Sequence, residues 1–256
     1  MNINQVALQL YTLRKHLSTP SDVAAAMKKV REIGYRAVQV SGMGPIEESE
    51  LVTILDGEGL VLCATHEPSD MVLDEPEKVV ERLRKLKCRL TAYPFPRGID
   101  FGDEGSVSNL IEKLNNAGKV LHEAGQILTY HNHAHEYRKL KGKPILDLIY
   151  EKTDPRYVQG ELDTYWVQMG GADILQEIGK LNNRLPMIHL KDCAVAETNQ
   201  PVFAEIGQGN MNFKAIIAAA EKVGCEWFIV EQDVCPADEF DSVRMSFDYI
   251  SENLLS

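Results

Sequence analysis

The chain has 256 residues, of which 44% are hydrophobic and 25% are charged, and this composition excludes disordered, collagen-like and coiled-coil chains. Its 27 lysines and arginines face 38 acidic residues, so the net charge of −11 gives no general attraction for nucleic acid or anionic lipid. The chain shows no signal-peptide pattern and no run of about 18 apolar residues, and its five scattered cysteines form no C-x-x-C pair. We expect a cytoplasmic protein that binds neither nucleic acid nor membrane.

Short apolar runs of β-strand character alternate with longer runs of helical period along the whole chain. The predicted strands are 5–10, 37–41, 60–65, 89–93, 126–131, 158–163, 187–190 and 227–231. Apolar residues at i, i+3 and i+4 spacing predict helices over 21–34, 46–59, 75–87, 106–125, 143–153, 170–183, 211–224 and 238–254. Glycines follow several of these helical runs, as is common at helix ends.

Eight strand–helix pairs with no linker between them predict one α/β domain over residues 1–256. A closed (β/α)₈ TIM barrel takes about 250 residues. The alternative is an open doubly wound sheet, but the segment QLYTLRKHLSTP after the first strand lacks the glycine-rich turn typical of that fold. We therefore predict a TIM barrel, whose reactive groups lie at the carboxyl ends of its strands.

Polar residues gather at those ends on four consecutive predicted strands. Because side chains alternate along a strand, the two members of each strand-end pair share a face. The pairs are His131 and His133, Glu161 and Asp163, His189 and Lys191, and Glu231 and Asp233. Imidazoles and carboxylates without thiolates suit one divalent ion such as Mn²⁺, Mg²⁺, Zn²⁺ or Co²⁺.

Simpler roles remain open for single members of this set. Asp163 is also suited to cap a helix, and His135 with Glu136 to lie in a solvated loop. His66 ends the third strand, and its HEP context does not continue as the zinc-protease pattern H-E-x-x-H. The run EIGQGNMNF at 205–213 is a weak phosphate-loop pattern because it lacks the lysine and hydroxyl ending.

The chain resembles the xylose isomerase-like TIM-barrel superfamily, in the branch of sugar phosphate isomerases and epimerases that also holds inosose dehydratase-like proteins. The motifs that carry the resemblance span nearly the whole chain: LQLYTLR, YHNHAHEY, ELDTYWVQMGG, IHLKD, EIGQGNMNF and IVEQD. The resemblance implies one divalent metal held from strands five to eight.

Many relatives hold this metal with Glu, Asp, His and Glu, and Asp163, His189 and Glu231 match the last three. The strand-five position differs, because it offers His131, with His133 as the alternative. A neutral imidazole in place of a carboxylate leaves the metal a stronger Lewis acid. The implied metal ligands are therefore His131, Asp163, His189 and Glu231.

The resemblance implies a sugar isomerase or epimerase that abstracts a proton beside a carbonyl and forms a metal-stabilised enediolate. An inosose or keto-sugar dehydratase and a non-catalytic sugar-binding homologue are the alternatives, and a nuclease like endonuclease IV conflicts with the acidic charge. The expected partner is a sugar or cyclitol, and a homo-oligomer is left open. We assign catalytic roles to Glu231 as base, Glu161 as support, Lys191 and His133, and substrate contacts to His66, Trp166 and Glu136.

Overall fold

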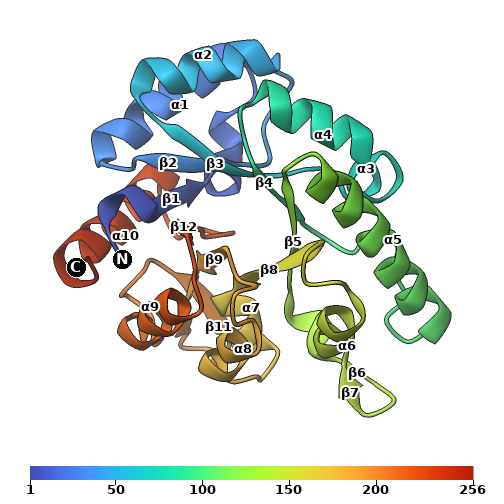
Figure 1. Ribbon diagram of the computed structural model, residues 1–256. Helices are drawn as coiled ribbons and strands as arrows, with labels where there is room; N and C mark the ends of the chain where they lie inside the picture. Colours follow the sequence, from blue (N-terminus) through green and yellow to red (C-terminus); the bar gives the residue numbers. More distant parts are fainter. Residues whose placement is uncertain (256) are drawn as a thin grey trace.

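The computed structural model describes residues 1–255, and its centre is a closed barrel of eight parallel strands (Figure 1). Around the barrel the strands follow the order β1-β12-β9-β8-β5-β4-β3-β2. These strands are β1 (Val6–Gln9), β2 (Ala37–Val40), β3 (Val61–His66), β4 (Leu90–Tyr93), β5 (Ile127–His131), β8 (Val158–Asp163), β9 (Met187–Leu190) and β12 (Trp227–Val230). The predicted TIM barrel is confirmed.

Helices form a ring outside the barrel (Figure 1). They are α1 (Pro20–Ile33), α2 (Glu48–Glu58), α3 (Ser69–Asp74), α4 (Pro76–Lys85), α5 (Glu104–Glu123), α6 (Ile145–Lys152), α7 (Thr164–Met169), α8 (Ile174–Lys180), α9 (Phe213–Lys222) and α10 (Glu239–Asn253). Short 3₁₀ helices span Ile3–Gln5, Leu10–His16 and Ala134–Tyr137. Among residues 1–255, no helix is long and apolar enough to cross a membrane.

Local sequence signals set the ends of these helices. The Thr19 hydroxyl accepts a hydrogen bond from the Asp22 backbone N–H, and the Asp22 carboxylate accepts one from the Thr19 backbone N–H. This capping box, with Pro20 at the first helical position, starts α1. The helix ends at Gly34, whose φ of 130° is open to glycine alone. The sequence predicts one helix over 170–183, but the structure differs. Gly170 caps the end of the preceding helix α7, and α8 begins only at Ile174.

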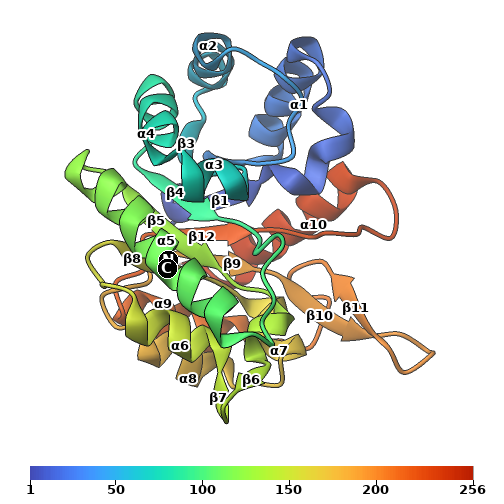
Figure 2. The same cartoon turned by 90° about the vertical axis from the view of Figure 1, so that its right-hand side faces the viewer.

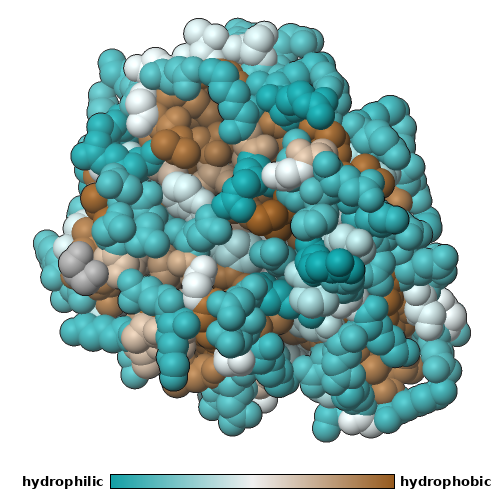
Figure 3. All heavy atoms as spheres, viewed as in Figure 1, coloured by the Kyte–Doolittle hydropathy of each residue, from teal (hydrophilic) through white to brown (hydrophobic). Residues whose placement is uncertain are grey.

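Apolar side chains fill the space between the strands and the helix ring, and they form one large buried cluster. A second, smaller cluster of alanines and other apolar residues lies inside the barrel, around Ala7, Ala64 and Met187. Hydrophilic residues cover most of the face seen in Figure 3, with apolar residues in smaller groups between them. The barrel is therefore a packed frame on which the strand ends are held in place.

Two hairpins interrupt the strand–helix repeat. One pairs β6 (Lys139–Leu140) with β7 (Lys143–Pro144), and the other pairs β10 (Asp192–Val195) with β11 (Pro201–Ala204). The β10–β11 hairpin projects from the body of the molecule in Figure 2. It accounts for the long connection that the sequence shows between the seventh and eighth barrel strands.

Candidate functional site

The polar residues at the ends of four neighbouring strands lie together inside the barrel mouth. His131 ends β5, Asp163 ends β8, His189 lies in β9 and Glu231 directly follows β12. Strand register places His131 opposite Glu161 and Asp163 opposite His189. All five side chains are buried, with exposures of 5% or less. The register, together with the alternation along each strand, is what brings them to one place.

His131, Asp163, His189 and Glu231 each offer a nitrogen or oxygen atom, and these atoms lie within 4.8 Å of one another. Opposite ligands of an octahedral ion with bonds of about 2.1 Å are about 4.2 Å apart, so a small contraction closes the group around a cation. These four residues are the metal ligands expected from the sequence. Their mixture of imidazole and carboxylate suits a borderline or hard divalent ion.

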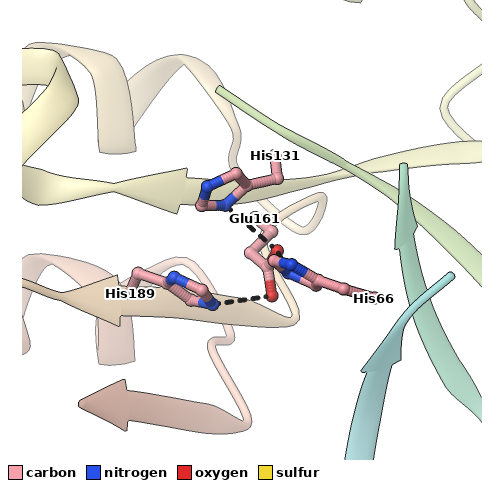
Figure 4. Close-up of side chains that lie close together, drawn as sticks. All are labelled: His66, His131, Glu161 and His189. Carbon is pink, nitrogen blue, oxygen red and sulfur yellow. Dashed lines mark hydrogen bonds and ion pairs between the residues drawn. The ribbon is translucent and has the colours of Figure 1, made fainter. Parts of the chain in front are cut away.

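A second group, His66, His131, Glu161 and His189, meets the same distance limit and shares two histidines with the first. Glu161 lies between the three imidazoles (Figure 4). One of its oxygens lies 2.7 Å from His66 Nε2, and the other is 3.1 Å from His189 Nε2. His131 Nδ1 is 3.2 Å from the carboxylate.

Glu161 is already well supplied with hydrogen-bond donors. Besides His66, the side-chain amide of Gln39 donates to it at 2.6 Å. Gln39 Oε1 in turn lies 2.7 Å from His189 Nε2, so that Gln39 and Glu161 together hold one edge of the His189 ring. This leaves His189 Nδ1 facing Glu231 Oε2 at 2.9 Å and Asp163 Oδ2 at 3.8 Å. A histidine fixed through one nitrogen by a carboxylate is the usual arrangement around a protein-bound metal.

The two carboxylate oxygens of Asp163 have different partners. Its Oδ1 accepts the Trp166 backbone N–H at 3.0 Å and caps α7, so the helix-cap role weighed from the sequence is present. Its Oδ2 is buried and makes no well-formed hydrogen bond, with only the ion pair to Lys191 Nζ at 2.9 Å, and the buried His131 Nδ1 has only the 3.2 Å approach to Glu161. Buried polar atoms seldom lack a hydrogen bond unless an ion or water is their partner. The first group therefore fits a divalent cation better than the saturated Glu161 does.

Lys191 supplies a positive charge to the same carboxylates. It is 1% exposed, and its Nζ lies 2.9 Å from Asp163 Oδ2, 2.7 Å from Glu231 Oε2 and 3.1 Å from Asp233 Oδ2. The Thr164 hydroxyl accepts the Lys191 backbone N–H at 2.9 Å and fixes the main chain there. Lys191 is thus a buried internal cation of the site and not a surface lysine.

Neighbouring charges shift the pKa values of these buried groups toward their charged forms. Burial raises the pKa of a carboxyl, but Lys191 outweighs this effect and brings the pKa of Asp163 to about 2. In the same way Lys191 and His189 overcome burial and hold the pKa of Glu231 well below its usual range. Burial lowers the pKa of an imidazole, yet Glu161 and Glu231 hold the pKa of His189 well above its usual value. The carboxylates therefore stay ionised and require nearby positive charge.

A cavity of about 530 Å³, called here the reaction cavity, opens at these strand ends. Its lining includes His66, His131, His133, Lys191, Glu231 and Asp233, with the exposed aromatic residues Tyr11 and Phe95 at its rim. Burial, followed by the neighbouring His131, lowers the pKa of His133 to about 2, so its ring is neutral. A substrate in this cavity meets imidazoles, an ammonium and two carboxylates.

Two expected substrate-contact residues lie beside this cavity and do not line it. The Trp166 ring centroid is 5.4 Å from that of His133 and 5.7 Å from Lys191 Nζ, so Trp166 packs beside two residues that line the cavity. Glu136 is fully buried, accepts the Tyr130 hydroxyl at 3.0 Å and accepts the His133 backbone N–H at 2.8 Å. Glu136 therefore shapes the loop that carries His133.

Gln39 and Asn132 were missing from the sequence assignments. Gln39 is fully buried and bonded to Gln9, Glu161 and His189, and Asn132 Oδ1 accepts the backbone N–H of Asp163 at 3.0 Å. A polar residue at an inward position of the apolar strand AVQV was the available signal for Gln39.

The glycine-containing run at 205–213 binds an internal anion. Backbone N–H groups of Gly207, Gly209 and Met211 donate to the Asp192 carboxylate at 2.9 to 3.2 Å. A Cβ on Gly209 would lie 2.3 Å from Asp192 Oδ1, which explains glycine at this position. The weak phosphate-loop pattern thus corresponds to a loop whose backbone amides donate to the Asp192 carboxylate, and Asp192 directly follows Lys191.

Residues 27–248 match the family model of the xylose isomerase-like TIM barrel. An inosose dehydratase from Geobacillus thermodenitrificans is 31% identical over 160 residues, which are 56% of this chain and 53% of that protein, so the match spans about half of this relative. An inosose dehydratase from Mesomycoplasma hyopneumoniae strain J is 23% identical over 264 residues, 88% of this chain and 86% of that protein. A sugar phosphate isomerase/epimerase structure from Parabacteroides distasonis superposes with a TM-score of 0.85 at 22% identity, covering 99% and 96% of the two chains. The chain belongs to the xylose isomerase-like TIM barrel family, as its motifs predict.

Proposed function

We propose that the protein is a divalent-metal-dependent dehydratase acting on an inosose or a similar keto carbohydrate. The main support for this proposal is one group of residues, His131, Asp163, His189 and Glu231. Their ligand atoms lie within 4.8 Å of one another beside the reaction cavity. The similarity to inosose dehydratases favours water loss over the isomerase or epimerase reaction expected from the sequence.

The four residues named above would hold the ion, and the ion would supply Lewis-acid polarisation of the substrate carbonyl. His189 is suited to this role because Gln39 and Glu161 fix the nitrogen that faces away from Glu231. His131 reaches the cavity lining, as does Glu231, so a substrate oxygen can approach the open side of the group.

Side chains of the protein carry out the proton transfers. Glu231 faces the cavity and takes the proton from the carbon beside the carbonyl, while its second oxygen stays with the ligand group. The Lys191 ammonium lies 2.7 Å from Glu231 Oε2 and stabilises the negative charge that develops on the substrate oxygen. Loss of the neighbouring hydroxyl then needs a proton, and Asp233, whose pKa is raised to about 6 by burial and by Glu231, faces the cavity to supply it.

Product analysis separates the reactions that share this first step. The protein, loaded with Mn²⁺ or Co²⁺, is incubated with a panel of inososes and keto sugars, and products are identified by mass and by ultraviolet absorption. A dehydratase gives a product lighter by one water with a new conjugated carbonyl band. A product of unchanged mass with a moved or inverted hydroxyl identifies the isomerase or epimerase instead, and no turnover of any member contradicts the proposal.

A further inference from the structure

A second, larger cavity adjoins the reaction cavity. This side cavity has a volume of about 800 Å³ and lies over the ends of β2 and β3. The two share five lining residues, Ser41, His66, Pro68, Pro94 and Arg97. Each volume falls within the range of about 300–1,000 Å³ typical of pockets that take a whole small ligand. One six-membered carbohydrate ring in the reaction cavity leaves the side cavity free.

The lining of the side cavity mixes apolar and polar groups. Met43, Ile46 and Met71 are half-buried and pack against the core while facing the cavity. Glu48 and Glu67 lie on the same wall, together with Arg82. Such a mixture matches the two kinds of surface on a sugar, its C–H faces and its hydroxyl groups.

The charged part of that wall is fixed before any ligand binds. Arg82 Nε donates to both oxygens of Glu67 at 3.1 Å, and its Nη1 pairs with Glu48. Glu67 is only 3% exposed, so this ion pair is held in the protein body. The polar edges of this ion pair can bind hydroxyl groups of a ligand.

The loop that carries Gly42 and Gly44 also lines the side cavity and is held in place. The Gly44 backbone N–H donates to Leu17 O at 2.8 Å, and a Cβ on Gly44 would lie 2.2 Å from Ser18 O. Gly42 has a φ of +63° and packs against Tyr11, which also lines the reaction cavity. The side cavity is therefore a preformed feature joined to the site.

Arg97 stands at the junction with its guanidinium unused. It lines both cavities, and within residues 1–255 its side chain makes no hydrogen bond or ion pair. The guanidinium offers five N–H donors. Its backbone is fixed, since its N–H donates to Phe95 O at 2.8 Å.

We propose that the natural substrate is a two-unit carbohydrate, in which the reacting keto ring carries a second sugar that occupies the side cavity. The bond between the units crosses the junction at Arg97, which donates hydrogen bonds to the oxygens there. This inference rests on the proposed function for the identity of the reacting ring. It adds that the ring arrives attached to a second sugar.

The test compares a keto ring with the same ring linked glycosidically to glucose. For the wild-type protein we expect kcat/KM to be at least about tenfold higher for the linked substrate. Met43→Trp and Ile46→Trp, which fill the side cavity, and Arg97→Ala at the exposed junction should each lower kcat/KM for the linked substrate at least about tenfold more than for the free ring. Val61→Trp is the control, since Val61 is 54% exposed and lies outside both cavities.

Calorimetric binding of both compounds to the metal-loaded protein separates this inference from the proposed function. If neither compound reacts but the linked one binds tighter and Met43→Trp removes the difference, the two-unit inference holds and the proposed reaction fails. Equal kcat/KM and equal affinity for the two compounds overturn the inference. Equal losses for both compounds in all three variants overturn it as well.

Discussion

Lys191 Nζ lies 2.9 Å from Asp163 Oδ2, the carboxylate oxygen that also lies 3.8 Å from His189 Nδ1, another candidate metal ligand. The ammonium thus supplies positive charge to the same oxygen that a divalent ion would use. This relationship links the chain's internal electrostatics to its candidate cofactor.

Asp163→Asn should remove the metal while leaving the fold in place. Asparagine caps a helix about as well as aspartate, so the hydrogen bond to the Trp166 backbone N–H is kept while the charge on Oδ2 is lost. We expect metal content, measured by elemental analysis after gel filtration, to fall to a small fraction of the wild-type value, while circular dichroism shows the wild-type secondary structure. Full metal content in this variant would remove Asp163 from the ligand set.

The two strand-five histidines should differ. His131 belongs to the group of converging ligand atoms, whereas His133 lines the cavity and lies in a separate group with His135 and Glu136. We expect His131→Ala to lose metal, and His133→Ala to keep metal with a raised KM. Metal titration of both variants checks this, and the reverse pattern would exchange the two roles.

Lys191→Met should weaken both stability without metal and catalysis with it. Removing the cation leaves Asp163, Glu231 and Asp233 without their shared partner, and loss of one member of a buried ion pair costs about 3–5 kcal/mol. Added metal should raise the Tm of this variant more than that of wild type, because the ion replaces part of the missing charge. With metal bound, kcat/KM should remain at least about tenfold lower, or about 1.4 kcal/mol.

Chemical denaturation of metal-free and metal-loaded Lys191→Met gives the stability comparison. Lys180→Met is a matched control, since Lys180 is a half-exposed lysine that pairs with Asp147 and Glu177 away from the site. Equal metal responses in the two lysine variants would contradict the role of Lys191.

Glu231→Gln should stop proton abstraction while part of the metal stays bound. The amide keeps one oxygen for the ion and loses basicity, so exchange of the substrate C–H proton with deuterated solvent should fall at least about 100-fold. Glu161→Gln should lower metal affinity about 10–100-fold through its effect on His189 and His131, and exchange should return at saturating metal. Persistent exchange in Glu231→Gln combined with its loss in metal-saturated Glu161→Gln would assign the base to Glu161.

The alternation of side chains let the sequence predict which strand-end residues face the mouth. His131, Asp163, His189 and Glu231 follow from apolar strands that end in polar residues, and the structure brings these four together. Register across the barrel was not predictable. His66 and Gln39 contact Glu161 from strands far away in sequence. The arrangement of three imidazoles around Glu161 in Figure 4 therefore depends on how the eight strands close into a barrel.

The connection after β9 was the other feature beyond prediction. Asp192 directly follows Lys191 and resembles one more strand-end ligand, yet its carboxylate accepts backbone amides from the 205–213 run. Only the fold of the β10–β11 hairpin brings these amides to Asp192. A sequence pattern shows residue types, whereas the partner of a buried carboxylate is set by the path of the chain around it.

Anomalous diffraction from crystals soaked in Mn²⁺ would show whether the strand-end residues hold one divalent ion, because it locates the ion without relying on activity. We predict one strong peak, about 2.0–2.3 Å from atoms of His131, Asp163, His189 and Glu231, and its loss in Asp163→Asn crystals. A peak bounded instead by His66 and Glu161, or no peak at the strand ends of well-diffracting soaked crystals, would contradict it.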